Sequence, residues 1–553
     1  MRRLLLVALA ACGHAPPHQN TESFDALSNR VLDHLYHASP AFSVGLGFHD
    51  YDGKLPDITP AATAALIATY RADQQALEHY EPRTPLEREQ RDTLLINVHG
   101  NLFSLVDQDA LHTNPMNVVG DFNLDAYIIR DYAEPAVRAA AVVRLCSQAK
   151  TYLEQARTGL VLPIPRVWLE TAIMEFKGLS DFANKDVRGA FTTPPAELGP
   201  ALDACHAAFD AHVAWLEQQL PKATDAFALG KERFVKMLGE TEGIHTDLAT
   251  LERMAKADLD RNTHAIEAAA HEIDPNRPVA DVVAEVMKDR PTPATVLAVA
   301  EKQATEMRQF LIDHHIVTVP GDELALVRET PSFARWNSAS LSSAGPFEPK
   351  PLASYYYISP PDPSWTPEVQ TAYIPSTMNL LFTTIHEVYP GHFINALHLA
   401  RITSKVEKSL WSYTTGEGWA HYTEEMMYDE GAGGHTPRAH IGQLTEALLR
   451  NVRFVVALGE HTGGMSTNDA EQLFITRAFL DEGNAKQQAA RGTFDPMYLA
   501  YTVGKLAIMK LRTDWKLQHP TGTLQEFHDE FLAHGAAPLP VIRRAMVGDD
   551  NVL

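Results

Sequence analysis

Residues 383–392 read Thr-Thr-Ile-His-Glu-Val-Tyr-Pro-Gly-His, and residues 416–425 read Gly-Glu-Gly-Trp-Ala-His-Tyr-Thr-Glu-Glu. The first run contains a His-Glu pair and a second histidine, and the second run supplies glutamates. Two imidazoles and one carboxylate suit a catalytic zinc ion, and the glutamate beside the first histidine then serves as general base. The two runs therefore predict a zinc hydrolase site.

The spacing of the two histidines is unusual. In His-Glu-x-x-His they are four residues apart on one helical face, whereas His386 and His392 are six apart. Six residues of regular helix turn a side chain by about 240° and raise it by about 9 Å, which one zinc ion with bonds of about 2 Å cannot bridge. The helix must therefore break, and Pro390 and Gly391 can break it. The alternative is a buried helix that ends there with hydrogen-bonded histidines.

The pattern His-Glu-x-x-Pro-Gly-His, followed by Glu-Gly-Trp-Ala-x-Tyr-x-Glu, resembles the bacterial family called domain of unknown function 885. The helical fold of that family is similar to the zinc peptidases of the thimet oligopeptidase and Taq-type carboxypeptidase groups. The resemblance implies His386, His392 and Glu417 as zinc ligands and Glu387 as general base. It extends to residues 50–57, 355–361, 453–461 and 498–512, and so covers most of the chain.

The segment after Glu417 carries polar residues at helical spacing. Glu417, His421, Glu424 and Glu425 fall on overlapping faces, as a metal ligand and its supporting residues would. We expect Glu424, His421 and Tyr422 to surround the ligands, with Glu424 as the alternative ligand. An amphipathic surface helix is the other interpretation.

Further candidates lie outside the two runs. Tyr501 and His461 are candidates to stabilise an oxyanion, and Arg453 is a candidate to hold a substrate carboxylate. Lys505 could pair with substrate or with an acid, and Tyr357 could line the substrate cleft. For the two tyrosines, His461 and Arg453 a structural role is the alternative. Ala457 stands where the resembling family usually has an aspartate.

The N-terminus resembles a bacterial lipoprotein signal. Arg2 and Arg3 precede a short apolar run, and residues 9–12 read Leu-Ala-Ala-Cys. We expect a signal peptide over residues 1–11, lipidation of Cys12, and a tether over residues 12–21. This predicts a protein of the bacterial cell envelope, anchored at the outer membrane or periplasmic face. The alternative is an ordinary secretory signal and a secreted protein.

The composition limits which classes of binding partner are expected. The formal charge of −23 argues against nucleic-acid binding, which needs a basic surface. We therefore expect a peptide or peptide-like substrate, and we expect contact with a membrane only through the lipid. The sequence leaves the oligomeric state open. Cys146 and Cys205 could pair in an exported protein or remain free and buried.

The rest of the sequence predicts a mainly α fold, with a large helical body and a small β-sheet beside the active-site cleft, as in the resembling metallopeptidases. Helical periodicity recurs from residue 22 to residue 316. Short β-branched or aromatic runs follow at residues 317–319, 324–327, 353–358 and 371–374. We expect one domain over residues 22–553, with two lobes at 22–316 and 317–553 as an option.

Together these features predict a zinc-dependent hydrolase, most plausibly a metallopeptidase of the carboxypeptidase or oligopeptidase kind. Two alternatives remain at this point. One is a zinc amidase or esterase that acts on a non-peptide or cell-wall substrate. The other is a catalytically inactive, peptide-binding lipoprotein in which the altered motif no longer holds metal.

Overall fold

The fold is described here from a computed structural model, which covers residues 22–331, 335 and 338–553. The predicted signal peptide, Cys12 and the tether lie outside the described residues. The structure confirms a mainly α fold with one small sheet among the described residues. None of the helices in the described part of the chain combines the length and apolar character that crossing a membrane requires.

The first half of the chain is helical, and local sequence explains many of the helix starts. Thr59 accepts a hydrogen bond from the N–H of Ala62, and Pro60 occupies the first turn, as a helix N-terminus favours. The helices are α1 (Phe24–Ala38), α2 (Pro40–Leu46), α3 (Pro60–His79), α4 (Pro85–Leu102), α5 (Ala110–Thr113), α6 (Ala126–Ile129), α7 (Pro135–Gly159), α8 (Arg166–Phe182), α9 (Leu198–Glu217), α10 (Lys231–Glu242), α11 (Leu248–Ile273), α12 (Val279–Val286) and α13 (Val296–Asp313).

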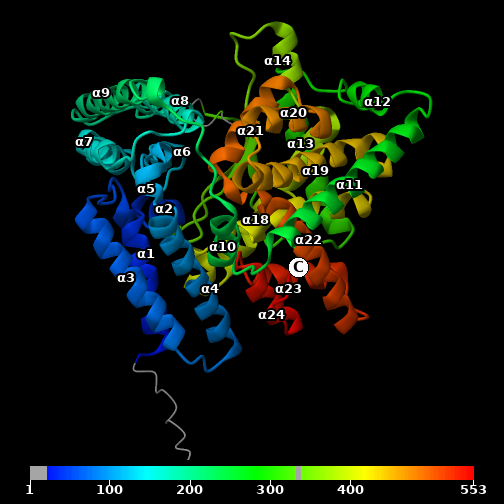
Figure 1. The fold of residues 1–553 in the computed structure, drawn as a ribbon, viewed down its shortest axis with the longest axis horizontal. Helices are drawn as coiled ribbons and strands as arrows, with labels where there is room; N and C mark the ends of the chain where they lie inside the picture. Colours follow the sequence, from blue (N-terminus) through cyan, green and yellow to red (C-terminus); the bar gives the residue numbers. More distant parts are fainter. Residues whose placement is uncertain (1–21, 332–334, 336–337) are drawn as a thin grey trace, which may run out of the picture.

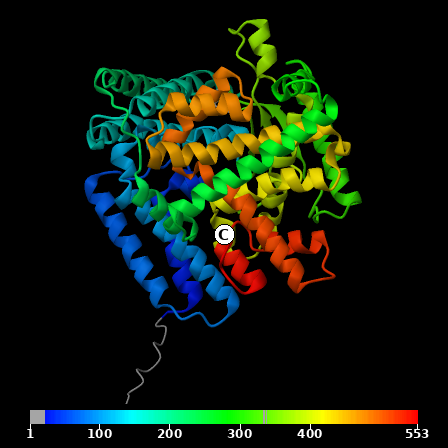
Figure 2. The ribbon, with the colours of Figure 1, turned by 45° about the vertical axis from the view of Figure 1, so that its right-hand side comes forward.

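The second half contains the predicted metal-binding runs. Its helices are α14 (Pro367–Tyr373), α15 (Thr377–Glu387), α16 (His392–Arg401), α17 (Lys405–Ser409), α18 (Tyr413–Asp429), α19 (Pro437–Leu458), α20 (Thr467–Ala478), α21 (Glu482–Phe494), α22 (Ala500–Gln518), α23 (Leu524–Ala533) and α24 (Leu539–Val547). In Figures 1 and 2 the helices α18–α22 lie centrally, while α1–α9 stand to one side.

The apolar cores divide the chain at a different place from the predicted lobes. Helices α7–α9 share one cluster, and α1, α3 and α4 share another. Helices α10 and α13 pack instead into the same cluster as α15, α18, α19 and α22. Apart from Phe103, the core that carries the metal-binding runs therefore begins at Leu229 and not at residue 317.

The two cysteines of the helical body form a disulfide. Cys146 of α7 is bonded to Cys205 of α9, with their Cα atoms 4.9 Å apart. The bond fastens two neighbouring helices of the α7–α9 cluster. Of the two options open from the sequence, the structure shows the paired one.

The sheet has three strands in the order β1-β3-β2. Strand β3 (Ser354–Ile358) is central, with β1 (Ala325–Glu329) parallel and β2 (Ala339–Ser342) antiparallel to it. The predicted runs at 324–327 and 353–358 are confirmed. The predicted strand at 371–374 is wrong, because Thr366 caps α14 and Pro367 begins it. Residues 317–319 form no strand either.

Candidate metal centre

The helix breaks between the two histidines, as their spacing predicts. Helix α15 ends at Glu387 and α16 begins at His392, on either side of a cis Tyr389–Pro390 bond. The N–H of Gly391 donates to the carbonyl of Ile385 at 2.9 Å. A Cβ atom at this glycine would stand 1.7 Å from the carbonyl oxygen of His386. Only glycine allows so close a return of the chain.

Two sets of hydrogen bonds hold helix α18 in place, one to the break and one at the start of the helix. The indole N–H of Trp419 donates to the carbonyl of Pro390 at 3.0 Å. At the start of the helix, the buried carboxylate of Glu242 accepts hydrogen bonds from Ser412 and from the N–H groups of Tyr413 and Thr414. An anion at a helix N-terminus stabilises the helix. These contacts set the position of Glu417 in the first turns of α18.

Three predicted ligands meet at one point. Glu417 Oε2 lies 3.4 Å from His386 Nε2 and 3.3 Å from His392 Nε2, and the three ligand atoms all lie within 4.8 Å of one another. In a tetrahedral site with bonds of about 2.0–2.1 Å, neighbouring ligand atoms are about 3.3 Å apart. Glu417 Oε2 is also buried, and no described residue forms a hydrogen bond with it. The donor set and its spacing fit a zinc ion.

Glu424 supports this cluster from behind. Its Oε1 lies 2.7 Å from His386 Nδ1 and 3.5 Å from the guanidinium of Arg450. Burial would raise the pKa of the Glu424 carboxyl, but Arg450, His421 and His386 hold it below its ordinary value. The carboxylate can therefore accept a hydrogen bond from Nδ1–H of His386. This tautomer leaves Nε2 of His386 without a proton and free to bind a metal. Glu424 therefore contacts the far side of His386 and is not among the three residues whose ligand atoms converge.

The two other residues expected around the ligands differ from each other. His421 is fully buried, with Nδ1 3.4 Å from Glu424 Oε2, so it contacts the site through Glu424. Tyr422 does not, because its hydroxyl bonds His528 and Arg512 on another side of α18. Successive residues of a helix point about 100° apart, which separates the two side chains.

Tyr501 lies beside the cluster because two helices cross closely. A Cβ atom at Gly418 of α18 would be 2.5 Å from the Cα of Gly504 in α22. This contact brings the ring of Tyr501 to 6.4 Å from the ring of His386, centre to centre. The Tyr501 hydroxyl lies 3.4 Å from the guanidinium of Arg491. The structure thus brings the oxyanion candidate next to the predicted ligands.

Arginine and tyrosine side chains surround Tyr501. The guanidinium of Arg453 stacks 4.8 Å from the Tyr501 ring and 4.9 Å from the Tyr498 ring. Arg491 bonds the Tyr413 hydroxyl and pairs with Asp495 at 3.0 Å. Sequence reasoning missed Arg450, Arg491 and Tyr413, since they come from three different helices. The sequence carried one signal for them: Arg491 and Asp495 are one helical turn apart, which is a common spacing of ion pairs.

Two predicted functional residues have structural roles instead. Lys505 is fully buried and pairs with Asp258 at 2.9 Å and Glu425 at 3.2 Å, so it cannot bind substrate. His461 is also buried. Its Nδ1 accepts from the N–H of Leu229, and its Nε2 lies 2.8 Å from the carbonyl of Gly492. Both ring nitrogens are used by the backbone, so His461 has no proton to offer an oxyanion.

The sheet presents different tyrosines on its two faces, because side chains alternate along a strand. The Tyr356 hydroxyl lies 3.2 Å from Thr384 Oγ1 of α15. Tyr357 lies on the opposite face and stacks with Tyr355, so the structure does not bring it to the three ligands. Glu387 follows His386 at the end of α15 and is half-buried. Burial raises the pKa of the Tyr356 hydroxyl, and the nearby charge of Glu387 adds to that rise.

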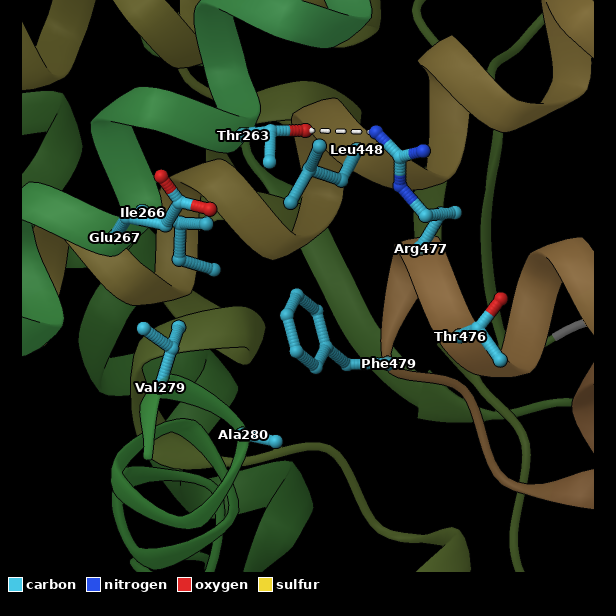
Figure 3. A pocket seen from close by; sticks show the side chains of 9 residues that line it. All are labelled: Thr263, Ile266, Glu267, Val279, Ala280, Leu448, Thr476, Arg477 and Phe479. Atoms are coloured by element: carbon cyan, nitrogen blue, oxygen red, sulfur yellow. Dashed lines mark hydrogen bonds between the residues drawn. The ribbon is translucent and has the colours of Figure 1, made fainter. Parts of the chain in front are cut away.

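A separate groove lies away from the metal centre. Its volume is about 440 Å³, and Figure 3 shows Phe479 in its middle, between α11, α12, α19 and the end of α20. Arg477 reaches Thr263 across one end of the groove at 3.3 Å. None of the sequence-predicted site residues in the described part of the chain lines it.

Comparison with known proteins gives a family and a fold. Residues 40–546 match the family described as a bacterial protein of unknown function, DUF885. No curated protein matches the chain. A candidate lipoprotein of unknown function from Shewanella oneidensis is 23% identical, with a TM-score of 0.77 over 95% of this chain and 100% of its own. A candidate lipoprotein from Colwellia psychrerythraea has a TM-score of 0.80 at 15% identity, over 95% of this chain and 98% of its own. At these identities the likeness shows the fold alone.

Proposed function

We propose that this chain, which belongs to the bacterial family DUF885, is a zinc-dependent hydrolase that cleaves peptide bonds. One observation carries the proposal. Glu417 Oε2 lies at the separations of a tetrahedral zinc site from His386 Nε2 and His392 Nε2, and the three ligand atoms lie within 4.8 Å of one another. Without a cation, two nitrogen atoms and a buried carboxylate oxygen would face one another with no donor that bonds this oxygen regularly, and burying such a group costs free energy.

The protein side of the proposed reaction uses residues next to these ligands. When bound, zinc polarises the scissile carbonyl and makes a water molecule more acidic. Glu387 accepts the proton of the attacking water and passes it to the leaving amine. Tyr501, beside His386, donates its O–H to the developing oxyanion. Glu424 holds His386 in the orientation and tautomer that the metal requires.

The site of action in this proposal is the bacterial cell envelope. Two solved structures of similar fold are described as candidate lipoproteins, and residues 9–12 of this chain read Leu-Ala-Ala-Cys. Lipidation of Cys12 would hold the enzyme at a membrane surface. The disulfide between Cys146 and Cys205 also suits an oxidising compartment outside the cytoplasm.

The test compares zinc-loaded wild type with Glu387→Gln on a panel of short peptides. We expect Glu387→Gln to keep its zinc and its fold and to lose at least about 100-fold in kcat, since general-base catalysis contributes that much or more. The exposed Glu430→Gln, at the far end of α18, is the matched control and should retain full activity.

Other outcomes would identify a different function. Hydrolysis of esters or non-peptide amides in place of peptides, with the same dependence on Glu387, would make the protein an amidase or esterase. Peptide binding without hydrolysis of any substrate in the panel, in protein that carries zinc, would contradict the proposed activity.

A further inference from the structure

Arg453 carries a positive charge that no described side chain balances. It is 7% exposed, and its only hydrogen bond to a described side chain joins Nε to Gln488 Oε1 at 2.9 Å. Within the described part of the chain, no carboxylate forms an ion pair with it. Burying a charge is costly unless the charge is paired. The two terminal nitrogens of this guanidinium therefore suit an anion from outside the chain.

The neighbouring arginines differ from Arg453 in this respect. Arg450 pairs with Glu424 and Glu446, and Arg491 pairs with Asp495. Their charges are balanced within the protein. Arg453 is the member of this cluster that keeps its charge available.

Arg453 is also held in a fixed orientation. Its guanidinium packs over two rings, 4.9 Å from the centre of the Tyr498 ring and 4.8 Å from the centre of the Tyr501 ring. Gln488 holds Nε and also accepts from the Tyr498 hydroxyl. A guanidinium fixed through Nε offers its terminal nitrogens as a fork, the arrangement that binds a carboxylate with two hydrogen bonds.

The distance to the metal centre limits what the anion can be. Arg453 lies 4.8 Å from the Tyr501 ring, which in turn lies 6.4 Å from the His386 ring. These two steps together span at most roughly three residues of extended backbone. An anion on Arg453 is thus within about three residues of a peptide bond held at His386, His392 and Glu417.

We propose that Arg453 binds the free C-terminal carboxylate of the substrate, so that the enzyme removes residues from the C-terminal end of peptides. The proposal rests on the proposed function and names its substrate class. In each cycle one water is consumed. The C–N bond of the scissile peptide breaks. The water oxygen ends in the new carboxylate of the shortened peptide, and both water protons end on the amine of the released residue or short peptide, which leaves as an ammonium group.

The test measures binding and not only hydrolysis. Zinc-loaded Glu387→Gln protein is titrated calorimetrically with an N-acetylated tripeptide as the free acid, as the C-terminal amide, and as an amide whose last residue is glutamate. We expect the free acid to bind roughly tenfold or more tightly than either amide, because a charge-assisted hydrogen bond contributes about 1.5–3 kcal/mol. The amide that ends in glutamate carries only a side-chain carboxylate, so its affinity distinguishes recognition of a side chain from recognition of the C-terminus.

Three variants in the same background locate the effect. Arg453→Met should abolish the preference for the acid. Gln488→Glu should also abolish it without a change of side-chain size, since it supplies the anion that Arg453 lacks. Arg477→Met, in the separate groove of Figure 3, is the matched control and should keep the preference.

Equal affinity for acid and amide would overturn the inference, as would a preference that survives both Arg453→Met and Gln488→Glu. Tight binding of the glutamate amide would assign Arg453 to a side chain and overturn the C-terminal specificity. Acid preference in a protein that hydrolyses nothing would contradict the proposed function but not the carboxylate site. Hydrolysis of the free acid and the amide at the same rate would contradict the carboxylate site but not the proposed function.

Discussion

At the level of single residues, the metal centre depends on which nitrogen of His386 is left free. Glu424 lies 2.7 Å from Nδ1, while Nε2 faces Glu417. A carboxylate that accepts a hydrogen bond from Nδ1–H fixes the orientation of the ring and makes Nε2 a better metal ligand. Glu424 is itself kept charged by Arg450 and His421, which hold its pKa below the ordinary value.

Replacement of Glu424 by glutamine should weaken zinc binding about 10- to 100-fold, the usual cost of losing such an outer partner. The amide oxygen can still accept a hydrogen bond from the Nδ1–H of His386 but carries no charge. Zinc affinity would be measured by competition with a chromogenic chelator. Glu425→Gln is the control, because Glu425 pairs with Arg261 and Lys505 and does not contact the ligands. Equal zinc affinity in Glu424→Gln and wild type would remove Glu424 from the site.

At the level of elements, the site depends on one helix break and one close crossing. The break at Pro390 and Gly391 brings His392 to the same point as His386 although six residues separate them. The crossing of α18 and α22 at Gly418 and Gly504 brings Tyr501 to that point. Neither contact leaves room for a larger side chain.

Gly391→Ala tests the break directly. Its Cβ atom would stand 1.7 Å from the carbonyl oxygen of His386, so the chain must shift and His392 must move away. We expect a loss of stability of about 3 kcal/mol or more, at the upper end of the cost of overpacking, together with loss of bound zinc. Thermal unfolding and metal analysis measure both. Gly45→Ala is the control, since nothing lies within 4 Å of its Cβ position. Unchanged stability and zinc content in Gly391→Ala would contradict the role of the break.

At the level of the whole molecule, the metal centre and the disulfide belong to different cores. The metal-binding helices share a cluster with α10 and α13, whereas Cys146 and Cys205 lie in the α7–α9 cluster. Stability of the two regions should therefore respond to different changes. Zinc should stabilise the first, and the disulfide should stabilise the second.

Cys146→Ala combined with Cys205→Ala should lower the free energy of unfolding by about 4 kcal/mol, as chain entropy predicts for a bond that joins residues 59 apart. Denaturant unfolding would measure the change. Zinc content and peptide hydrolysis at low temperature should stay as in wild type, because the metal centre lies in another core. A loss of zinc in the double variant would show that the two regions are coupled.

The sequence predicted the parts of this site that follow from spacing along the chain. The six-residue separation of His386 and His392 required a break, and the break is present. Spacing could not reveal contacts between distant helices, so Arg491 and Tyr413 were missed. It also could not tell which face of a helix is buried, so pairing of Lys505 with substrate stayed open beside pairing with an acid, and the structure shows the acid pairing inside the core. Strand β2 was missed because Ala339–Ser342 consists of small residues and one leucine, with no β-branched or aromatic signal.

Metal content is the most direct measurement of the central claim. It would be determined on protein purified without chelators, for wild type, for His392→Ala and for His398→Ala. His398 is the control, because it lies six residues further on and its Nε2 lies 2.9 Å from the carbonyl of Thr318. We predict about one zinc per chain, as for a single catalytic site, in wild type and His398→Ala, and loss of that zinc in His392→Ala. Wild-type protein that binds no zinc, or zinc that His392→Ala leaves unchanged, would contradict a metal centre formed by His386, His392 and Glu417.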